Sequence, residues 1–511
     1  MRRLAWLASL AWLASLASLA LLVSFVSPAS LAGAIAGEVP AGAVTSASEC
    51  LRPHRFHPAT GTTQHGDLRV IGIQYDQQVA DVTSYATFRH AMTCLMREFV
   101  VPHERPGEPT LVVFNEDIGL MTLATGSRGA LVRAQEATPL RAPAGDTEPV
   151  GAAVALGELN AAYAPQVAAY QAMFGPIDPR KEVLVAETDT MVRAFDLTFS
   201  AIAKRFGVYL VASNNQAPYR ETHSPALVRL FGDPAIPGLR TAYVATSSKV
   251  YNTTFLWGPH DVHPHAPAGE RNLLFRNEKV PLTSLESSIL DLDPGPSSGP
   301  AAIRNAAGYV VAGHRLGFAT SLPAFAYGYP FGRRPRHFRP CADLAVSYMA
   351  CMSKLGVDTV IQAEANPGRW AGNGGAGDWQ PLDWMGSAWR AVADPTVRFR
   401  YAVNPMLVGN LLDLDFDGQS AILARGYRGP PRHYVGDARL DRDDGDPASA
   451  AVYAGAKRQF MALAPWVQAG GSRAALRTEG ARLAAGSGSS QEDDYVETAV
   501  YADLAPAKEP R

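Results

Sequence analysis

Short apolar runs of strand length alternate with segments of helical periodicity through most of this 511-residue chain. The first strand is expected at Leu68–Gln74, and apolar residues at helical spacing follow over 84–100. Such alternation favours one layered α/β domain over several small domains. Further strands are expected at 111–114, 208–212, 241–245, 251–257, 316–320, 357–362 and 398–403, with helices at 190–206 and 342–355.

The N-terminal segment has a different composition. Arg2 and Arg3 precede an uncharged run over 4–26, and Ala32-Gly33-Ala34 fits a small-residue cleavage site. The segment is therefore either a cleaved secretory signal or an uncleaved membrane anchor, and both alternatives direct the rest of the chain out of the cytoplasm. We expect an exported protein, periplasmic or extracellular, whose mature chain begins near Ile35 if the leader is removed.

Three long stretches, rich in Gly, Pro and Ala or in charges, interrupt the alternation. Compact domains seldom contain loops of such length without secondary structure, so we interpret these stretches as lids or surface insertions. They lie at 121–180, 326–340 and 426–490. The expected organisation is a leader over 1–34, a linker over 35–66, one domain over 67–506 and a tail over 507–511.

Composition narrows the function classes. The chain is 47% hydrophobic and 18% charged, as expected for a globular protein with a large core. Its net charge of −2 gives no electrostatic case for nucleic-acid binding. Export favours disulfides among Cys50, Cys94, Cys341 and Cys351, but three full pairings remain open. If one helix carried both Cys341 and Cys351, they would face different sides and could not bond.

Reactive side chains stand at the ends of expected elements. The strand Leu111-Val-Val-Phe-Asn-Glu116 ends in an acid, and Gly317-Phe-Ala-Thr-Ser321 ends in a hydroxyl. Between them lies Lys279-Val-Pro-Leu-Thr-Ser-Leu-Glu286. Singly, each residue is more typical of a solvated acid or a surface ion pair. In this order, at strand ends where α/β folds bind ligands, they indicate a functional site.

This arrangement resembles the nitrilase, or carbon–nitrogen hydrolase, superfamily. The family's Phe-Pro-Glu, Lys-x-x-Pro-Thr-x-x-Glu and Gly-x-Ala-x-Cys motifs are similar to 114–116, 279–286 and 317–321 here. Over about 68–504, the resemblance implies a four-layer αββα sandwich with long insertions. Further matches are Leu355-Gly356-Val357-Asp358, Asn404, Phe416-Asp-Gly-Gln-Ser420 and the closing strand Glu497–Leu504.

The resemblance also implies roles. Glu116 would be the general base, and Ser321 would stand where the family has its nucleophilic cysteine. Lys279 and the backbone N–H of Leu322 would stabilise the charge that develops on the substrate. Glu286 would orient Lys279 and the ammonia leaving group. The implied substrate is a small amide or nitrile, attacked through an acyl-enzyme without metal or cofactor.

Serine is the departure from the family pattern, because its hydroxyl is a far weaker acid than a thiol. Cys341 offers an alternative register, since it lies 15 residues before Gly356 and Ser321 lies 35 before it. The residues ahead of Cys341 do not form a strand pattern, so we favour Ser321 and treat 326–340 as an insertion. Neither His314 nor His337 belongs to the family pattern as a base for serine.

Several functions remain open. The leading hypothesis is an exported amidase or nitrilase-like hydrolase, with its substrate, the membrane at the N-terminus and a second copy in a homodimer as expected partners. A catalytically impaired member that binds a ligand or partner is second. An acyl-transferring relative such as apolipoprotein N-acyltransferase is third, because that enzyme has several membrane spans. Two motifs are assigned to surface loops: 260–265 has metal-site composition, and Arg333, Arg334, Arg336 and Arg339 are a solvated run or a patch for anionic substrate or headgroups.

Overall fold

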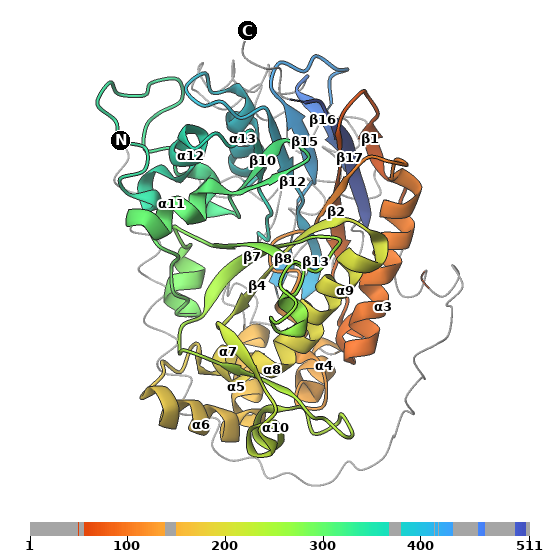
Figure 1. The fold of residues 1–511 in the computed structure, drawn as a ribbon, viewed down its shortest axis with the longest axis vertical. Helices are drawn as coiled ribbons and strands as arrows, with labels where there is room; N and C mark the ends of the chain where they lie inside the picture. Colours follow the sequence, from red (N-terminus) through yellow and green to blue (C-terminus); the bar gives the residue numbers. More distant parts are fainter. Residues whose placement is uncertain are drawn as a thin grey trace. The chain divides into compact units, whose positions relative to one another are not determined.

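The computed structural model describes residues 50, 56–137, 150–366, 380–412, 414–416, 418–432, 458–465 and 496–506. Within them, two β-sheets pack face to face and each is covered by helices on its outer side (Figure 1). This is the four-layer αββα sandwich that the resemblance implies. The expected leader and tail, and most of the expected linker, lie outside the described residues.

The larger sheet has nine strands among the described residues. Strands β2, β3 and β4 are parallel neighbours, as strand–helix–strand units require, and β7 and β8 add antiparallel strands at one edge. The order is β1 (Thr60–Thr62), β17 (Thr498–Leu504), β2 (Leu68–Asp76), β3 (Thr110–Val113), β4 (Tyr209–Gln216), β7 (Tyr251–Trp257) and β8 (Leu273–Glu278), with β13 (Leu407–Leu411) on β2 and β14 (Leu414–Phe416) on β13. Residues 60–62, which the sequence assigns to a linker, thus join the sheet by pairing with β17.

The smaller sheet contains the strand that leads toward Ser321. Its central strands β10, β11 and β12 are parallel, and antiparallel strands complete both sides. The order is β16 (Phe460–Leu463), β15 (Ala421–Ala424), β12 (Tyr401–Asn404), β11 (Thr359–Ile361), β10 (His314–Phe318) and β9 (Tyr309–Val311). The expected strand at 241–245 is present as β6 (Ala242–Ala245), but it pairs with β5 (Tyr219–Thr222) outside both sheets.

Three apolar clusters separate the layers. Val70 and Val113 of the larger sheet pack on Phe318 and Val403 of the smaller one. Neighbouring positions such as Ile71 face the helices instead, because successive strand residues point to opposite faces. Strands buried on both faces read as continuous apolar runs, which explains why they were recognisable in the sequence.

Helices cover both sheets, and α3, α9 and α12 lie where the sequence predicts helices, whereas α11 and α13 were not predicted. On the larger sheet lie α3 (Tyr85–Leu95), which continues as one more helical turn to Val100, and α9 (Leu197–Phe206). Ser84 caps α3, since its hydroxyl accepts from Thr87 N at 3.1 Å while the Thr87 hydroxyl accepts from Ser84 N at 2.8 Å. On the smaller sheet lie α11 (Gly299–Ala307), α12 (Leu344–Lys354) and α13 (Gln380–Ala393).

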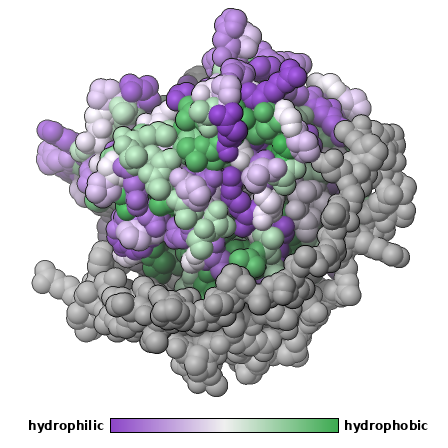
Figure 2. Space-filling view, turned by 90° about the horizontal axis from the view of Figure 1, so that it is seen from below, coloured by the Kyte–Doolittle hydropathy of each residue, from purple (hydrophilic) through white to green (hydrophobic). Residues whose placement is uncertain are grey.

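In its described residues, 121–137 and 150–180, the expected insertion at 121–180 is largely helical. It contains η5 (Leu120–Ala124), α4 (Ala130–Ala137), α5 (Val150–Ala162) and α6 (Ala164–Phe174), followed by α7 (Glu182–Ala186), α8 (Thr188–Met191) and later α10 (Pro225–Phe231). Leu159, Tyr163 and Tyr170 join the apolar cluster on the outer side of the larger sheet. Figure 2 shows the end where α5, α6 and α10 lie, and hydrophilic and hydrophobic residues are intermixed over its coloured part. The helices of this insertion therefore add to the helical layer that covers the outer side of the larger sheet.

The four cysteines form two disulfides, Cys50–Cys94 and Cys341–Cys351. Because α12 begins at Leu344, Cys341 precedes the helix and reaches Cys351 within it. The sequence analysis excluded this disulfide only if one helix carried both cysteines. Here only Cys351 lies in the helix, so the disulfide can form. In the described part of the chain, no helix is both long enough and apolar enough to cross a membrane.

His314, the first residue of β10, forms ion pairs with two carboxylates. Its Nε2 lies 2.8 Å from Asp67 Oδ1 and its Nδ1 lies 3.3 Å from Asp358 Oδ2, with the ring 1% exposed. Burial alone would lower the pKa of His314, but Asp358 and Asp67 outweigh it and raise the pKa above its usual value. The two carboxylates therefore favour the protonated form of His314, and these contacts do not orient it as a base for Ser321.

This ion pair predicts a pH-dependent stability. Because the folded pKa of His314 is raised, its contribution is complete below the unfolded pKa of about 6.5 and is lost as the pH rises through the folded value. We expect the free energy of unfolding, measured by urea denaturation across pH 5–9, to fall over this range more steeply in wild type than in His314→Gln. Exposed His337 provides the control, since His337→Gln should keep the wild-type slope. Equal slopes in all three proteins would contradict the assignment.

Candidate active site

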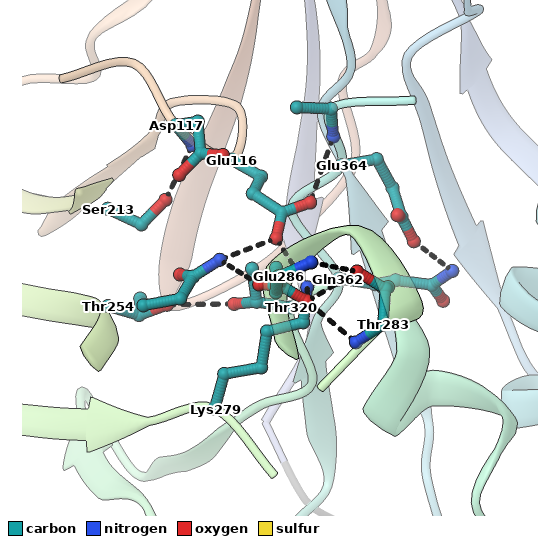
Figure 3. Close-up of polar contacts among 12 residues, drawn as sticks. Glu116, Asp117, Ser213, Thr254, Lys279, Thr283, Glu286, Thr320, Gln362 and Glu364 are labelled. Carbon is teal, nitrogen blue, oxygen red and sulfur yellow. Dashed lines mark hydrogen bonds and ion pairs between the residues drawn. The ribbon is translucent and has the colours of Figure 1, made fainter. Parts of the chain in front are cut away.

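The loops after β3, β8 and β10 carry the residues that the sequence singled out. Glu116 lies three residues beyond β3, Lys279 directly follows β8, and Ser321 follows β10. Glu286 lies in the short helical turn η8 (Leu285–Ile289). The structure brings Glu116, Lys279 and Glu286 into direct contact (Figure 3).

Lys279 is held between the two acids. Its Nζ lies 2.8 Å from Glu116 Oε1 and 2.8 Å from Glu286 Oε2. Lys279 is 3% exposed, and Glu116 and Glu286 are 2% and 4% exposed. Its backbone is fixed as well, because Lys279 N donates to Asn252 O at 2.9 Å and Gly295 N donates to Lys279 O at 2.9 Å. The ammonium therefore has one defined position.

Asn252 of β7 connects the same two acids and was not foreseen from the sequence. Its Nδ2 donates to Glu116 Oε1 at 2.9 Å and to Glu286 Oε1 at 2.8 Å. The side chain reaches both because β7 pairs with β8, the strand that precedes Lys279. The sequence does show a polar residue, Asn252, within a buried strand. That observation alone does not identify the residues it contacts.

The Thr-x-x-Glu part of the lysine motif closes a turn. Thr283 N and Thr283 Oγ1 each donate to Glu286 Oε2 at 2.8 Å, and Glu286 N donates to Thr283 Oγ1 at 3.2 Å. This reciprocal pattern is that of a capping box. Together with Lys279 and Asn252 it saturates the Glu286 carboxylate, so Glu286 is a fixed anion that holds the lysine.

Glu116 also connects the two sheets. Ala365, beyond the end of β11, donates its N–H to Glu116 Oε2 at 3.0 Å. Two residues earlier in the same segment, Ala363 O accepts from Ser321 N at 3.1 Å. The hydroxyl of Thr320 lies 2.7 Å from that of Thr254 on β7. These contacts place the Ser321 turn and the Glu116 cluster at one junction of the two sheets.

Ser321 has an unusual backbone. Its φ and ψ are +59° and −120°, at the sharp turn from β10 into the short helix η9 (Leu322–Phe325). Such a conformation costs a residue with a side chain on the order of 1–3 kcal/mol and occurs mainly at functional sites. Within the described residues, neither the Ser321 hydroxyl nor the N–H of Leu322 has a hydrogen-bond partner. A strained strand-to-helix turn is also how hydrolases present a nucleophilic serine.

The pKa values of the three buried groups shift in different directions. Burial would lower the pKa of Lys279, but Glu116 and Glu286 outweigh it and raise that pKa, so the ammonium is charged. Burial raises the pKa of Glu116 more than Lys279 lowers it. For Glu286, burial is outweighed by Lys279 and by the hydrogen bonds from Thr283 and Asn252, so its pKa is lowered. Glu116 is therefore the more basic carboxylate of the two.

Two more acids adjoin the cluster, and no motif in the sequence singled them out. Asp117 follows Glu116, and burial, followed by the Glu116 charge, raises its pKa well above the usual value. Glu364 lies three residues beyond β11 and is 0% exposed. Its Oε1 accepts from Gln362 Nε2 at 2.7 Å. Both acids lie just past strand ends, where the predicted elements had stopped.

The remaining candidates lie elsewhere. Cys341 is bonded to Cys351, so the alternative register has no free thiol, whereas β10 leads into Ser321. His260, His263 and His265 are exposed, as are Arg333, Arg334, Arg336 and Arg339, in keeping with surface loops. Among the described residues, one group has metal-ligand spacing: Cys50, His90 and Cys94 lie with ligand atoms within 4.8 Å, and its two sulfurs form the disulfide.

Comparisons with known proteins find distant likeness to solved structures alone. No protein-family model matches the chain, and no curated protein matches it. Among solved structures, an amidase from Nesterenkonia sp. is 13% identical with a TM-score of 0.34, covering 71% of this chain and 84% of that chain. A cysteine-to-serine mutant of the Nesterenkonia AN1 amidase, described as a member of the nitrilase superfamily, is 14% identical with a TM-score of 0.34, covering 70% and 85%. Likeness at this level carries no argument about the fold or the site.

Proposed function

We propose that this protein is an exported carbon–nitrogen hydrolase of the amidase or nitrilase type, which cleaves a small amide or nitrile through an acyl-enzyme on Ser321. The observation that carries the proposal is the buried Glu116–Lys279–Glu286 cluster at the junction with the strained Ser321 turn. The order of these residues along the chain and their resemblance to the nitrilase motifs support the same assignment.

A purely structural role explains the cluster poorly. Burying three charged groups costs several kcal/mol per ion before their mutual attraction is counted, and apolar residues of similar volume are often as stable. Structural ion pairs do not require a neighbouring serine with strained backbone dihedrals. Perturbed acids and a buried lysine that lie together at strand ends are typical of catalytic sites.

The proposed reaction begins with proton transfer from the Ser321 hydroxyl to Glu116. Serine Oγ then bonds to the substrate carbon, and negative charge develops on the substrate oxygen or nitrogen. Lys279 and the N–H of Leu322 stabilise this charge, and Glu286 keeps the ammonium in place. After the amine or ammonia leaves, water hydrolyses the acyl-enzyme. The raised pKa of Glu116 makes it a stronger base, which partly compensates for the weak acidity of serine.

The presence of serine at position 321 favours ligand binding without catalysis as a second candidate function. If its hydroxyl is not activated in the folded protein, the same site would bind an amide or a partner without turnover. This second candidate predicts ligand binding with no covalent intermediate, so detection of the intermediate separates the two proposals.

Trapping the acyl-enzyme tests the proposal. We expect incubation with p-nitrophenyl butyrate, followed by acid quenching, to add one butyryl group to the protein, located on the peptide that contains Ser321. Intact-mass and peptide mass spectrometry measure this directly. Ser321→Ala should show no adduct at this position. An adduct on another residue, or neither adduct nor hydrolysis of esters, amides and nitriles, would refute the function.

A further inference from the structure

Glu364 is fully buried and only half satisfied. Its backbone is fixed by Glu364 N donating to Pro405 O and by Leu407 N donating to Glu364 O, both at 3.0 Å. Its side chain accepts one hydrogen bond, from Gln362 Nε2 to Oε1 at 2.7 Å. Oε2 has no hydrogen-bond partner among the described residues. An unpaired buried oxygen costs about 1–3 kcal/mol, so it calls for an explanation.

This carboxyl adjoins the catalytic base. Ala365, the next residue, donates its N–H to Glu116 Oε2 at 3.0 Å, so Glu116 is anchored on the segment that carries Glu364. Figure 3 shows the two carboxyl groups next to each other, with Lys279 approaching Glu116 from below in this view. Lys279 and Asn252 contact Glu116, and neither forms a hydrogen bond or ion pair with Glu364.

The two acids therefore have different surroundings. Burial, and secondarily the charge of Glu116, raises the pKa of Glu364 well above its usual value. Burial also raises the pKa of Glu116, but there Lys279 and Asn252 oppose the rise and favour the ionised form. A pair of carboxyls in environments this different is the arrangement that assigns one acid and one base in hydrolases. The free oxygen of Glu364 is then the end that carries a transferable proton.

We propose that Glu364 is a catalytic residue that protonates the leaving nitrogen and later accepts a proton from the hydrolytic water. This inference rests on the proposed function and adds a second carboxyl to its chemistry. It specifies a substrate class as well: amides of poor leaving groups, such as ammonia and alkylamines, whose nitrogen must be protonated before the carbon–nitrogen bond breaks.

The proton balance closes over one turnover. In acylation the Ser321 proton moves to Glu116, the Oγ–C bond forms, the C–N bond breaks and the proton of Glu364 moves to the departing nitrogen. In deacylation a water proton moves to Glu364, the water oxygen bonds to the acyl carbon, and the Ser321 oxygen leaves with the proton held by Glu116. Glu116 is again ionised and Glu364 is again protonated, so no other reactant is required.

Leaving-group dependence tests the role. We compare kcat/KM, which reports acylation, for butyramide and p-nitrophenyl butyrate, which share one acyl group. Glu364→Gln should lower kcat/KM about 10²–10⁴-fold for the amide and change it less than about 3-fold for the ester, because p-nitrophenolate leaves without a proton. In wild type, kcat/KM for the amide should fall at alkaline pH as Glu364 loses its proton, and the ester should lack this limb.

Glu187 provides a matched control. It is also 0% exposed with neither carboxyl oxygen bonded within the described residues, but it lies at the junction of α7 and α8 beside Arg128. Glu187→Gln should change both substrates equally or not at all. Equal losses for amide and ester in Glu364→Gln would overturn the inference and indicate a structural role. So would the absence of a protonated-carboxyl band in the wild-type minus Glu364→Gln infrared difference spectrum at pH 7.

The same measurements keep the two proposals apart. A wild-type protein that hydrolyses neither substrate refutes the hydrolase function itself. A wild-type protein that hydrolyses both, with identical pH profiles for the amide and the ester, refutes the role of Glu364 alone. This comparison needs no variant, so it decides the question even if Glu364→Gln does not fold.

Discussion

Replacing Lys279 by methionine is expected to abolish amide hydrolysis and to lower the free energy of unfolding by roughly 3–5 kcal/mol. The Lys279 side chain is 2% exposed and is the partner of both Glu116 and Glu286. Methionine fills a similar volume but leaves two buried carboxylates without a cation, and they must then take up protons. Urea denaturation and a hydrolysis assay measure the two effects, and the destabilisation should shrink at acidic pH, where the acids are protonated in either state.

Lys181 supplies the control for this prediction. It too is held by two acids, with Nζ 3.0 Å from Asp291 and 3.1 Å from Asp293, but its side chain is 14% exposed at the surface. Lys181→Met should cost less than about 1 kcal/mol and leave activity unchanged. If both lysine variants behaved alike, the burial of Lys279 would have no special consequence. Retained hydrolysis in Lys279→Met would exclude it from the reaction.

The sequence was most informative where function depends on one continuous segment. The strands that became β2, β3, β7 and β10 are recognisable because both of their faces are buried. The Thr283–Glu286 turn is likewise local, and its residues appear at the spacing that a capping box requires. Glu116, Lys279 and Glu286 could therefore be named in advance, although their contact distances could not.

Contacts that depend on the order of strands in the sheets could not be predicted from the sequence. Asn252 reaches Glu116 and Glu286 because β7 lies beside β8, and Glu364 approaches Glu116 because the two sheets meet there. Neither residue carries a local pattern that encodes these neighbours. The Ala-rich helices α5 and α6 were missed for a different reason, since alanine on every face gives little periodic contrast.

The start of α12 determines the role of Cys341. The sequence predicts a helix from 342, and the structure starts α12 at Leu344, where Asp343 Oδ1 caps it by accepting from Ala345 N at 3.0 Å. Both starting points place Cys341 ahead of the helix. Because it lies ahead, Cys341 bonds to Cys351 and is removed as a nucleophile. Ser321 is then the remaining candidate nucleophile, and whether its hydroxyl reacts has to be tested by experiment.

Ser321→Ala is expected to lower kcat/KM for amides by at least about 10³-fold, and Ser321→Cys is expected to raise it above wild type. Removing a nucleophile typically leaves the residual rate enhancement that binding and charge stabilisation provide. A thiol gives up its proton to Glu116 far more easily than a hydroxyl and is the better nucleophile. Ammonia release from butyramide measures both variants, and pre-steady-state kinetics on p-nitrophenyl butyrate separates acylation from deacylation.

The cysteine pair supplies the control for Ser321. Cys341→Ala breaks the disulfide with Cys351 and should cost roughly 2–4 kcal/mol of stability, while activity measured well below the melting temperature is retained. Activity lost in Cys341→Ala but unchanged in Ser321→Ala would assign the nucleophile to the other register. If Ser321→Cys gains activity over an inactive wild type, Glu116 and Lys279 are correctly arranged and the serine alone limits the reaction. That result would favour the ligand-binding function for the natural protein, because its site would lack only the acidic proton that Glu116 can remove.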